Sequence, residues 1–543
     1  MVSVEEEQYF NEALNDKEKE LIAPFFSSTE SNVFVLTNLP EVIKGTLFSR
    51  YSRSDKGARR LLLDEFMPNK DVAEAIGSKS ASEHASTVLA INRAEDFYQR
   101  ILVGYGDDSV AELAGVHIAC ENISSIAADM LTDSRAGISP LEKSARYIPF
   151  DRKVNGRYLW YRDSKILNSR YADLYSDTMD RLFSSYSEWL PIVKEHVKAA
   201  VPRDPAATER AYDNAIRAKA CDILKNILPG GRLTNVGLYG NGRAFEYLLT
   251  KLYSSGIDEA KSLASRMHAE LSKVIPSFVK RASESEFLSS MRNAASEHAK
   301  RAVTKAEIPD DPAYLRLISY DSEGETEAIA AMLYPYSNLP LEEIRSMVKK
   351  STEDEKRGIL NACLSKRRNR RDKPGRAFEN PYYTFEICAN YGMFRDLHRH
   401  RVVTQERQHL TTDLGFDIPP ELKEIGLEPD YVELMQSARA ANLKMREEMP
   451  NEAQYLVPRA FRMRWYMRMN LREAYHLTEL RSMKQGHPDY RKVAQQMKSL
   501  IAEKHPLLAE YMQVDMNDYA LPRIESEKRI DQKLADLDSK KDG

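Results

Sequence analysis

The chain contains the same short pattern twice, and this long-range repeat is the strongest constraint on its fold. Pro229 is followed after eleven residues by Asn241-Gly242-Arg243, and Pro458 is followed after eleven residues by Asn470-Leu471-Arg472. The two occurrences lie 229 positions apart at both the proline and the asparagine, without a gap. Each N-x-R triplet also opens a stretch with apolar residues at helical spacing. Although two short matches can arise by chance, the sequence predicts two diverged copies of one fold.

The repeat divides the 543 residues into four segments. We assign residues 1–30 to an acidic, helical N-terminal extension, 31–290 to the first copy, 291–523 to the second copy, and 524–543 to a charged tail that we expect to fray. Apolar residues at spacings of three and four predict helices over 84–102, 109–132, 170–198, 243–282, 430–448 and 490–512. Short strands are predicted at 33–36, 146–150 and 316–320. The expected fold class is therefore α+β, helix-rich, with small sheets.

Composition excludes several classes of protein. The 79 basic and 82 acidic residues give a net charge of −3, so the chain is not basic throughout. No apolar run approaches the roughly 18 residues that a membrane helix needs, and the N-terminus lacks the order of a signal peptide. The four cysteines form no C-x-x-C pair. We therefore expect a cytoplasmic protein with no membrane contact.

The most prominent local motif is Arg399-His400-Arg401. Guanidinium groups offer planar, paired donors, so two arginines around a histidine can grip a phosphate or an electron-rich flavin ring. A solvated basic helix end is the alternative. His398 and His400 are spaced as a metal pair could be, but no cysteine or carboxylate stands at ligand spacing beside them. We therefore expect no metal.

A second group of arginines is spaced four residues apart, at Arg464, Arg468 and Arg472, and Arg481 follows nine residues later. On a helix the first three would share one face. Like charges on one face are unfavourable, so the pattern indicates an anionic partner, or pairing with acids elsewhere in the fold.

Two further segments can bind anions. Glu142, Ser144, Arg146 and Tyr147 combine a hydroxyl and an arginine two residues apart, which suits a phosphate. The run 366–373 has six basic residues in eight and could contact nucleic acid, but it contains no aromatic residue for base stacking. A solvated loop is the favoured interpretation of this run, and a nucleic-acid partner is not expected. The chain has no G-x-G-x-x-G, Walker A, G-x-S-x-G or H-E-x-x-H motif.

Together these pieces resemble the flavin-dependent thymidylate synthases, a helix-rich family of homotetramers. The family carries R-H-R followed by E-x-S-x-R-Y, an upstream G-H-x-S-V-x-E-H segment, and a downstream L-P…N-x-R…H…L-R segment. In the first copy, residues 106–113, with Ser109, match the upstream segment without its histidines, and 133–135 keep only the last arginine of R-H-R. Glu142, Ser144, Arg146 and Tyr147 match the nucleotide-holding loop, and Lys225 stands where the family has a nucleotide-binding arginine.

The second copy resembles the family in the complementary positions. Arg399-His400-Arg401 is intact, whereas 409–412 lack the S-x-R-Y loop. Asn470, Arg472 and His476 match flavin-contacting positions. Arg481 matches the arginine that helps to ionise the uracil ring, and the first copy has Leu252 there.

This division implies one composite site for each pair of copies, because sites of the family lie between subunits. The resemblance implies FAD-dependent reductive methylation of dUMP to dTMP, with NADPH and methylenetetrahydrofolate as co-substrates. Arg481 and Arg399 would be catalytic, and the remaining matched residues would bind cofactor or substrate. Two chains would form a homodimer of four fold units. Another flavin or nucleotide enzyme on the same fold, or a binding protein without activity, are the alternatives.

Overall fold

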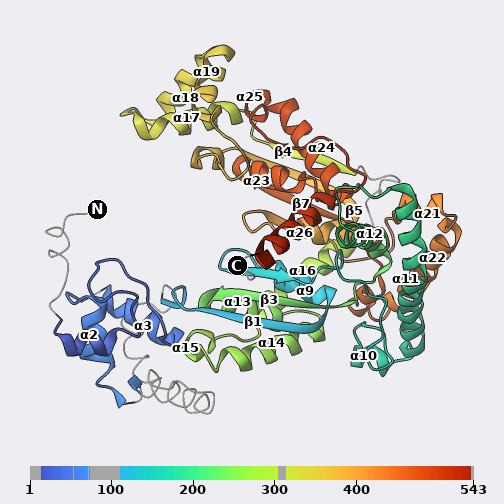
Figure 1. The fold of residues 1–543 in the computed structure, drawn as a ribbon, viewed down its shortest axis with the longest axis horizontal. Helices are drawn as coiled ribbons and strands as arrows, with labels where there is room; N and C mark the ends of the chain where they lie inside the picture. Colours follow the sequence, from blue (N-terminus) through green and yellow to red (C-terminus); the bar gives the residue numbers. More distant parts are fainter. Residues whose placement is uncertain (1–13, 53, 71, 74–109, 304–313, 540–543) are drawn as a thin grey trace. The chain divides into compact units, whose positions relative to one another are not determined.

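The computed structural model describes residues 14–52, 54–70, 72–73, 110–303 and 314–539 (Figure 1). The chain divides into two compact units. The first unit comprises Met1–Glu121, Met130–Glu142 and Asn235–Ala306, and the second comprises Asn122–Asp129, Lys143–Thr234 and Glu307–Gly543. The units differ from the sequence copies, since a long part of the first copy, 143–234, packs within the second unit.

A three-stranded sheet organises the first unit. Its strands are β1 (Gly115–Ser124), β3 (Leu233–Asn241) and β2 (Ile138–Glu142), in the order β1-β3-β2. Strand β3 is antiparallel to β2 and leads directly into helix α13 (Gly242–Tyr253). The remaining helices of this unit are α2 (Asp16–Ile22), α3 (Glu41–Tyr51), α4 (Ala58–Leu61), α14 (Asp258–Leu271), α15 (Pro276–Val279) and α16 (Glu286–Val303).

The second unit contains a four-stranded antiparallel sheet in the order β4-β5-β7-β6. The strands are β4 (Leu315–Tyr320), β5 (Tyr382–Asn390), β6 (Thr404–Arg407) and β7 (Arg462–Asn470). Strand β7 leads into helix α23 (Leu471–Arg481), as β3 leads into α13. The order β5-β7-β6 therefore reproduces β1-β3-β2, and β4 is an addition at the edge.

Most of the remaining helices belong to the second unit. Helix α9 (Ser125–Thr132) follows β1, and α20 (Tyr391–Leu397) follows β5. The others are α10 (Ser164–Leu167), α11 (Ala172–Ala200), α12 (Glu209–Leu224), the 3-10 turn η3 (Lys225–Ile227), α17 (Gly324–Leu333), α18 (Leu341–Lys350), α19 (Glu353–Leu364), α21 (Pro420–Glu424), α22 (Glu428–Arg446), α24 (Pro488–Lys504), α25 (Pro506–Ala509) and α26 (Ile524–Ser539). No helix among the described residues is both long enough and apolar enough to cross a membrane.

The two repeated prolines meet inside the second unit. Pro229 and Pro458, equivalent residues of the two copies, form an antiparallel bridge. The flanking hydrogen bonds are reciprocal: Gly230 N donates to Val457 O at 2.9 Å, and Arg459 N donates to Leu228 O at 3.1 Å. The two donors lie 229 positions apart in the sequence, and so do the two acceptors. Such reciprocal contacts are those of a two-fold interface between identical subunits. The two copies therefore meet here as the halves of a dimer do.

Several secondary-structure predictions are confirmed, and others are wrong. Helices α11, α13 to α15, α22, and α24 with α25 lie where periodicity predicted them, and β4 matches the strand expected at 316–320. The helix predicted over 109–132 is wrong across its centre, which forms β1 because it pairs with β3. Residues 146–150 form no strand, and 33–36 contribute only the isolated bridge of Leu36 to Phe26. The prediction for 84–102 lies outside the described residues.

Residues 524–539 are not frayed. They form α26, which packs on α12. Asp531 of α26 contacts Thr208 and Arg210, and Lys528 pairs with Asp204. The charges that suggested a solvated tail are used in these surface ion pairs.

Candidate functional site

The R-H-R motif and the N-x-R triplet of the second copy line one cavity of about 310 Å³ in the second unit. The R-H-R residues follow α20, Asn470 ends β7, and the other principal residues come from α23. The cavity is lined by Lys373, Glu379, Arg399, His400, Arg401, Val402, Asn470, Arg472, Glu473, His476, Leu480 and Arg481. The structure thus brings together the predicted cofactor-binding residues of the second copy with the predicted catalytic Arg481 and Arg399.

The local sequence explains how α23 presents these side chains. Asn470 caps the helix, since its side-chain oxygen accepts a hydrogen bond from Glu473 N at 2.9 Å. Arg472, His476 and Leu480 then recur at intervals of four residues and share one helix face. Strand, cap and helix together place this face against the R-H-R segment.

A buried hydrogen-bond chain orients Arg481. Its Nε donates to His400 Nε2 at 3.0 Å, and His400 Nδ1 donates to Glu473 Oε1 at 2.7 Å. Burial, together with the positive charge of Arg481, lowers the pKa of His400 well below its usual value. The neutral imidazole can therefore accept from Arg481 and donate to Glu473 at once, which fixes its tautomer.

The charge of the cavity favours an anionic ligand. Five cationic side chains line it, against the two carboxylates of Glu379 and Glu473. Arg472 pairs with Glu379 at 2.8 Å, and the buried His476 Nδ1 has no hydrogen-bond partner among the described residues. His400, Glu473 and His476 place ligand atoms within 4.8 Å of one another, as a metal site could. The surplus of arginine and lysine opposes the binding of a cation at this place.

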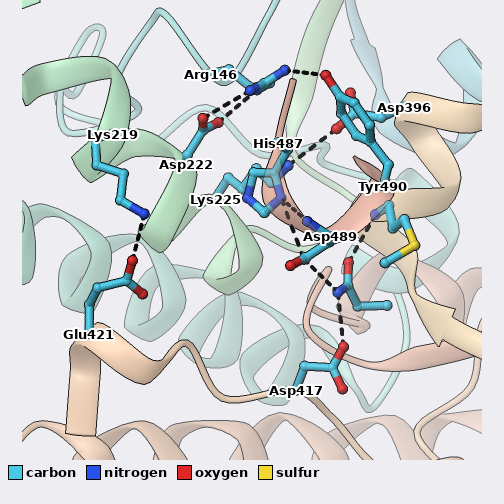
Figure 2. A network of polar contacts seen from close by, with 12 residues as sticks. Arg146, Lys219, Asp222, Lys225, Asp396, Asp417, Glu421, His487, Asp489 and Tyr490 are labelled. Carbon is cyan, nitrogen blue, oxygen red and sulfur yellow. Dashed lines mark hydrogen bonds and ion pairs between the residues drawn. The ribbon is translucent and has the colours of Figure 1, made fainter. Parts of the chain in front are cut away.

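A second cluster gathers predicted substrate-binding residues of the first copy. Figure 2 shows the Arg146 guanidinium between Asp222 and Tyr490. Its Nε and Nη2 donate to the two oxygens of Asp222 at 2.8 and 3.1 Å, and Nη1 donates to the Tyr490 hydroxyl at 2.9 Å. Burial opposes the charge of Arg146, but Asp222 and Tyr490 outweigh it and raise its pKa. The pair is therefore ionised and rigidly held.

Lys225 adds a second cation to this cluster. It is 3% exposed, and its Nζ lies 3.2 Å from Asp396 Oδ2. Burial raises the pKa of Asp396, but Lys225, Arg146 and Arg399 together lower it below its usual value. Asp396 lies on α20, three residues before Arg399. The ion pair therefore joins a first-copy cation to the second-copy helix that leads into R-H-R.

Tyr490 connects the cluster to the cavity. The Arg481 guanidinium lies over the Tyr490 ring at 5.8 Å, and the Tyr490 hydroxyl accepts from Arg146. One aromatic side chain thus contacts both the predicted phosphate-gripping arginine and the predicted activating arginine. Within one chain, residues of both copies meet at this point.

The other predicted site residues have different surroundings. Ser109 lies outside the described residues. Glu142 is the last residue of β2 and belongs to the first unit, whereas the cluster around Arg146 belongs to the second. The Ser144 hydroxyl accepts from Arg146 N at 3.3 Å, and Tyr147 is exposed beneath the Arg523 guanidinium, 4.3 Å from its ring centre.

Sequence reasoning missed Asp222, Asp396, Tyr490 and Arg523. Arg523 donates to Asp222 Oδ2 and to the Arg146 carbonyl, both at 3.1 Å. The sequence did contain one indication of Asp222: it stands three residues before Lys225, a spacing that places both side chains on one helical turn. The arginine series was wrongly predicted as one helix face, because Arg464 and Arg468 lie on β7 and only Arg472 and Arg481 lie on α23.

The fold and the cavity define an α+β protein with two related halves and an arginine-rich pocket in the second unit. The chain belongs to the family described as thymidylate synthase complementing protein, whose model matches residues 61–277 and 316–507. One match falls in each copy, which confirms the resemblance and agrees with a tandem duplication. A UPF0159 protein of Chlamydia muridarum is 39% identical over 94% of this chain and 98% of its own length. A UPF0159 protein of Thermoplasma acidophilum is 34% identical over 90% and 98%.

Proposed function

We propose that the protein is a flavin-dependent thymidylate synthase, which methylates dUMP to dTMP at a composite site within one chain. The observation that carries the proposal is the contact of Tyr490 with both Arg146 and Arg481. Arg146 belongs to the family's nucleotide-holding loop in the first copy, and Arg481 to its activating position in the second. The membership of the family supports the same activity.

The cavity suits the electron-rich ring of FAD, because its arginines and the buried His476 Nδ1, which has no partner in the part of the chain that the structure describes, offer polar contacts to a planar ligand. When bound, the flavin supplies the hydride chemistry, with NADPH as reductant and methylenetetrahydrofolate as carbon donor. Arg399, Arg401 and Asn470 would hold it.

The chain's own residues would bind and polarise dUMP. Arg146 and Lys225 would hold the phosphate, with Ser144 beside them. Arg481, fixed by His400 and Glu473, would stabilise negative charge that develops on the pyrimidine. This arrangement requires no nucleophilic cysteine, and burial raises the pKa of Cys120 and Cys221 to about 11, which suppresses their thiolates.

The experiment uses two variants, separately and mixed. Arg481→Ala should lower kcat about 10²- to 10³-fold, and Arg146→Ala should raise the KM for dUMP. A mixture of both variants should stay inactive after dissociation and reassociation, since each chain then carries one damaged half of its own site. Arg468→Ala, an exposed arginine on β7, is the control and should behave as wild type. Recovery of activity on mixing would place the site between chains, and failure to rescue a thymidine auxotroph would contradict the synthase activity.

A different nucleotide substrate on the same fold is the second candidate. Asp222 and Asp396 already neutralise Arg146 and Lys225. An anion entering this cluster must compete with two carboxylates, which favours a substrate that differs from dUMP in its polar groups. Flavin reduction by NADPH without dTMP formation would support this candidate. Light scattering would test the homodimer that we propose for the assembly.

A further inference from the structure

The basic run 366–373 lies beside the cavity of the second copy. Its last residue, Lys373, lines that cavity, and the carbonyl of the following Pro374 accepts a hydrogen bond from Arg472 Nε at 2.8 Å. The run is therefore part of the wall around the ligand-binding pocket.

Buried contacts fix this run against α23. Arg367 donates to both oxygens of Glu479 at 2.9 and 3.1 Å, and its side chain and that of Glu479 are 7% and 1% exposed. Arg367 also donates to the carbonyls of Asp372 and Tyr511. Because Glu479 is on the helix that carries Arg472 and His476, the run has a defined position relative to the pocket.

The charges of the run fall into two groups. Arg367 and Arg368 are paired, with Glu479 and Asp372 respectively. In the part of the chain that the structure describes, neither Arg370 nor Lys373 has a carboxylate within ion-pair distance. Burial lowers the pKa of His476, and the positive charges of Lys373 and Arg370 lower it further, so both act on the pocket. Lys373, the cation of the run that lines the pocket, thus has no carboxylate partner among the described residues.

The first copy has no such run. Glu112 pairs with Arg243 at 2.9 Å as Glu379 pairs with Arg472 at 2.8 Å, which makes the two acids equivalent. At the same distance before Glu112, residues 99–106 read QRILVGYG and contain a single arginine. The basic run is therefore a property of the second copy, which also retains R-H-R.

We propose that Lys373 binds the phosphate part of a nucleotide ligand whose ring occupies the cavity of the second copy. A volume of about 310 Å³ is at the lower end for ligand pockets, so it accommodates the ring of a flavin nucleotide but not the whole molecule. The phosphates then lie at the rim of the cavity, beside Lys373. This inference rests on the proposed function in taking the ring to be a flavin.

Calorimetric titration with riboflavin, FMN, FAD and ADP tests the proposal on the full chain. Lys373→Ala should weaken FMN, FAD and ADP about 10- to 100-fold, because charged hydrogen bonds are lost, and should leave riboflavin unchanged. The control, Lys366→Ala, removes the same charge from a residue of the run that does not line the cavity and should have little effect.

The outcomes separate the two proposals. Equal weakening of riboflavin, or equal weakening by the control variant, would overturn the phosphate role. If no flavin binds to the wild-type protein but ADP binds in a Lys373-dependent manner, the phosphate site stands and the flavin enzyme does not. If none of the four ligands binds, both proposals are wrong.

Discussion

The two copies retain the same pocket framework but fill it with different chemistry. In the first unit a cavity of about 730 Å³ is lined by Glu112, Asn241 and Arg243, the counterparts of Glu379, Asn470 and Arg472. The asparagine caps the following helix in both, and the arginine–glutamate pair is present in both. The framework follows from the strand–cap–helix sequence that N-x-R encodes.

The charges in the two pockets differ. Where the second copy has His476 and Arg481, the first has Tyr247 and Leu252, and Arg281 of the first pocket is paired with Glu246. The first pocket is thus lined by two arginines and two glutamates, whereas the second has a surplus of positive charge. A duplicated fold can therefore keep its scaffold in both copies while only one keeps the means to bind an anion.

At the two-fold contact between the copies, equivalent residues carry opposite charges. Ser124 and Asn390 cap α9 and α20, and the residue five positions later is Asp129 in one helix and Arg395 in the other. These equivalent residues pair at 3.2 Å, both nearly fully buried. Two identical subunits would present the same charge from both sides of a two-fold axis, so this pair is available only to a fused and diverged dimer.

Reversing this pair should give the largest effect. Asp129→Arg would place a third cation beside Arg395 and Arg407, and we expect a loss of about 3–5 kcal/mol in the free energy of unfolding. The exchange Asp129→Arg with Arg395→Asp should recover part of that loss, because opposite charges face each other again. Urea titrations of the three proteins measure this. Equal stability of the single and double variants would show that the two residues do not interact.

Removing the equivalent arginine from each pocket should show which of the two pockets binds the cofactor. Arg472→Ala should weaken FAD about 10- to 100-fold, since a charged contact in the ligand pocket is lost. Arg243→Ala removes the same residue from the first pocket and should leave FAD affinity unchanged. Fluorescence titration measures both, and a comparable loss from Arg243→Ala would mean that the first copy also holds the cofactor.

The grouping of residues along α23 could be predicted from the sequence because these parts of the pocket are local. Arg472 and His476 lie one helical turn apart, and Asn470 caps the helix, so short-range spacing was sufficient. The same spacing of four misled at Arg464 and Arg468, because residues four apart share a face in a strand as well as in a helix. In this segment a better indication of a strand was the alternation of apolar residues with arginine and tyrosine. The apolar residues, all buried, are Met463, Trp465, Met467 and Met469.

The network of Figure 2 could not be predicted in the same way. Arg146 and Tyr490 are separated by 344 positions, and Lys225 and Asp396 by 171. Such contacts depend on how the copies meet at Pro229 and Pro458, which no local pattern encodes. The division of motifs between the copies indicated a shared site, but the carboxylates that hold its cations were found only in the structure.

The smallest effect concerns a buried histidine of the second copy that the first copy lacks. His398 is 1% exposed, its Nδ1 donates to the Phe394 carbonyl, and burial lowers its pKa to about 3. Its counterpart in α9, 266 positions earlier, is the buried Thr132. Below pH ~6.5 the unfolded chain binds a proton that folded His398 excludes. Stability should therefore fall as the pH drops from ~6.5 towards 3, by at most about 1.4 kcal/mol per pH unit from this group.

His398→Thr should lower stability at pH 7 through lost packing but flatten the decline of stability between pH 6.5 and 5, as urea midpoints at several pH values would show. An unchanged slope would mean that His398 is protonated in the folded protein.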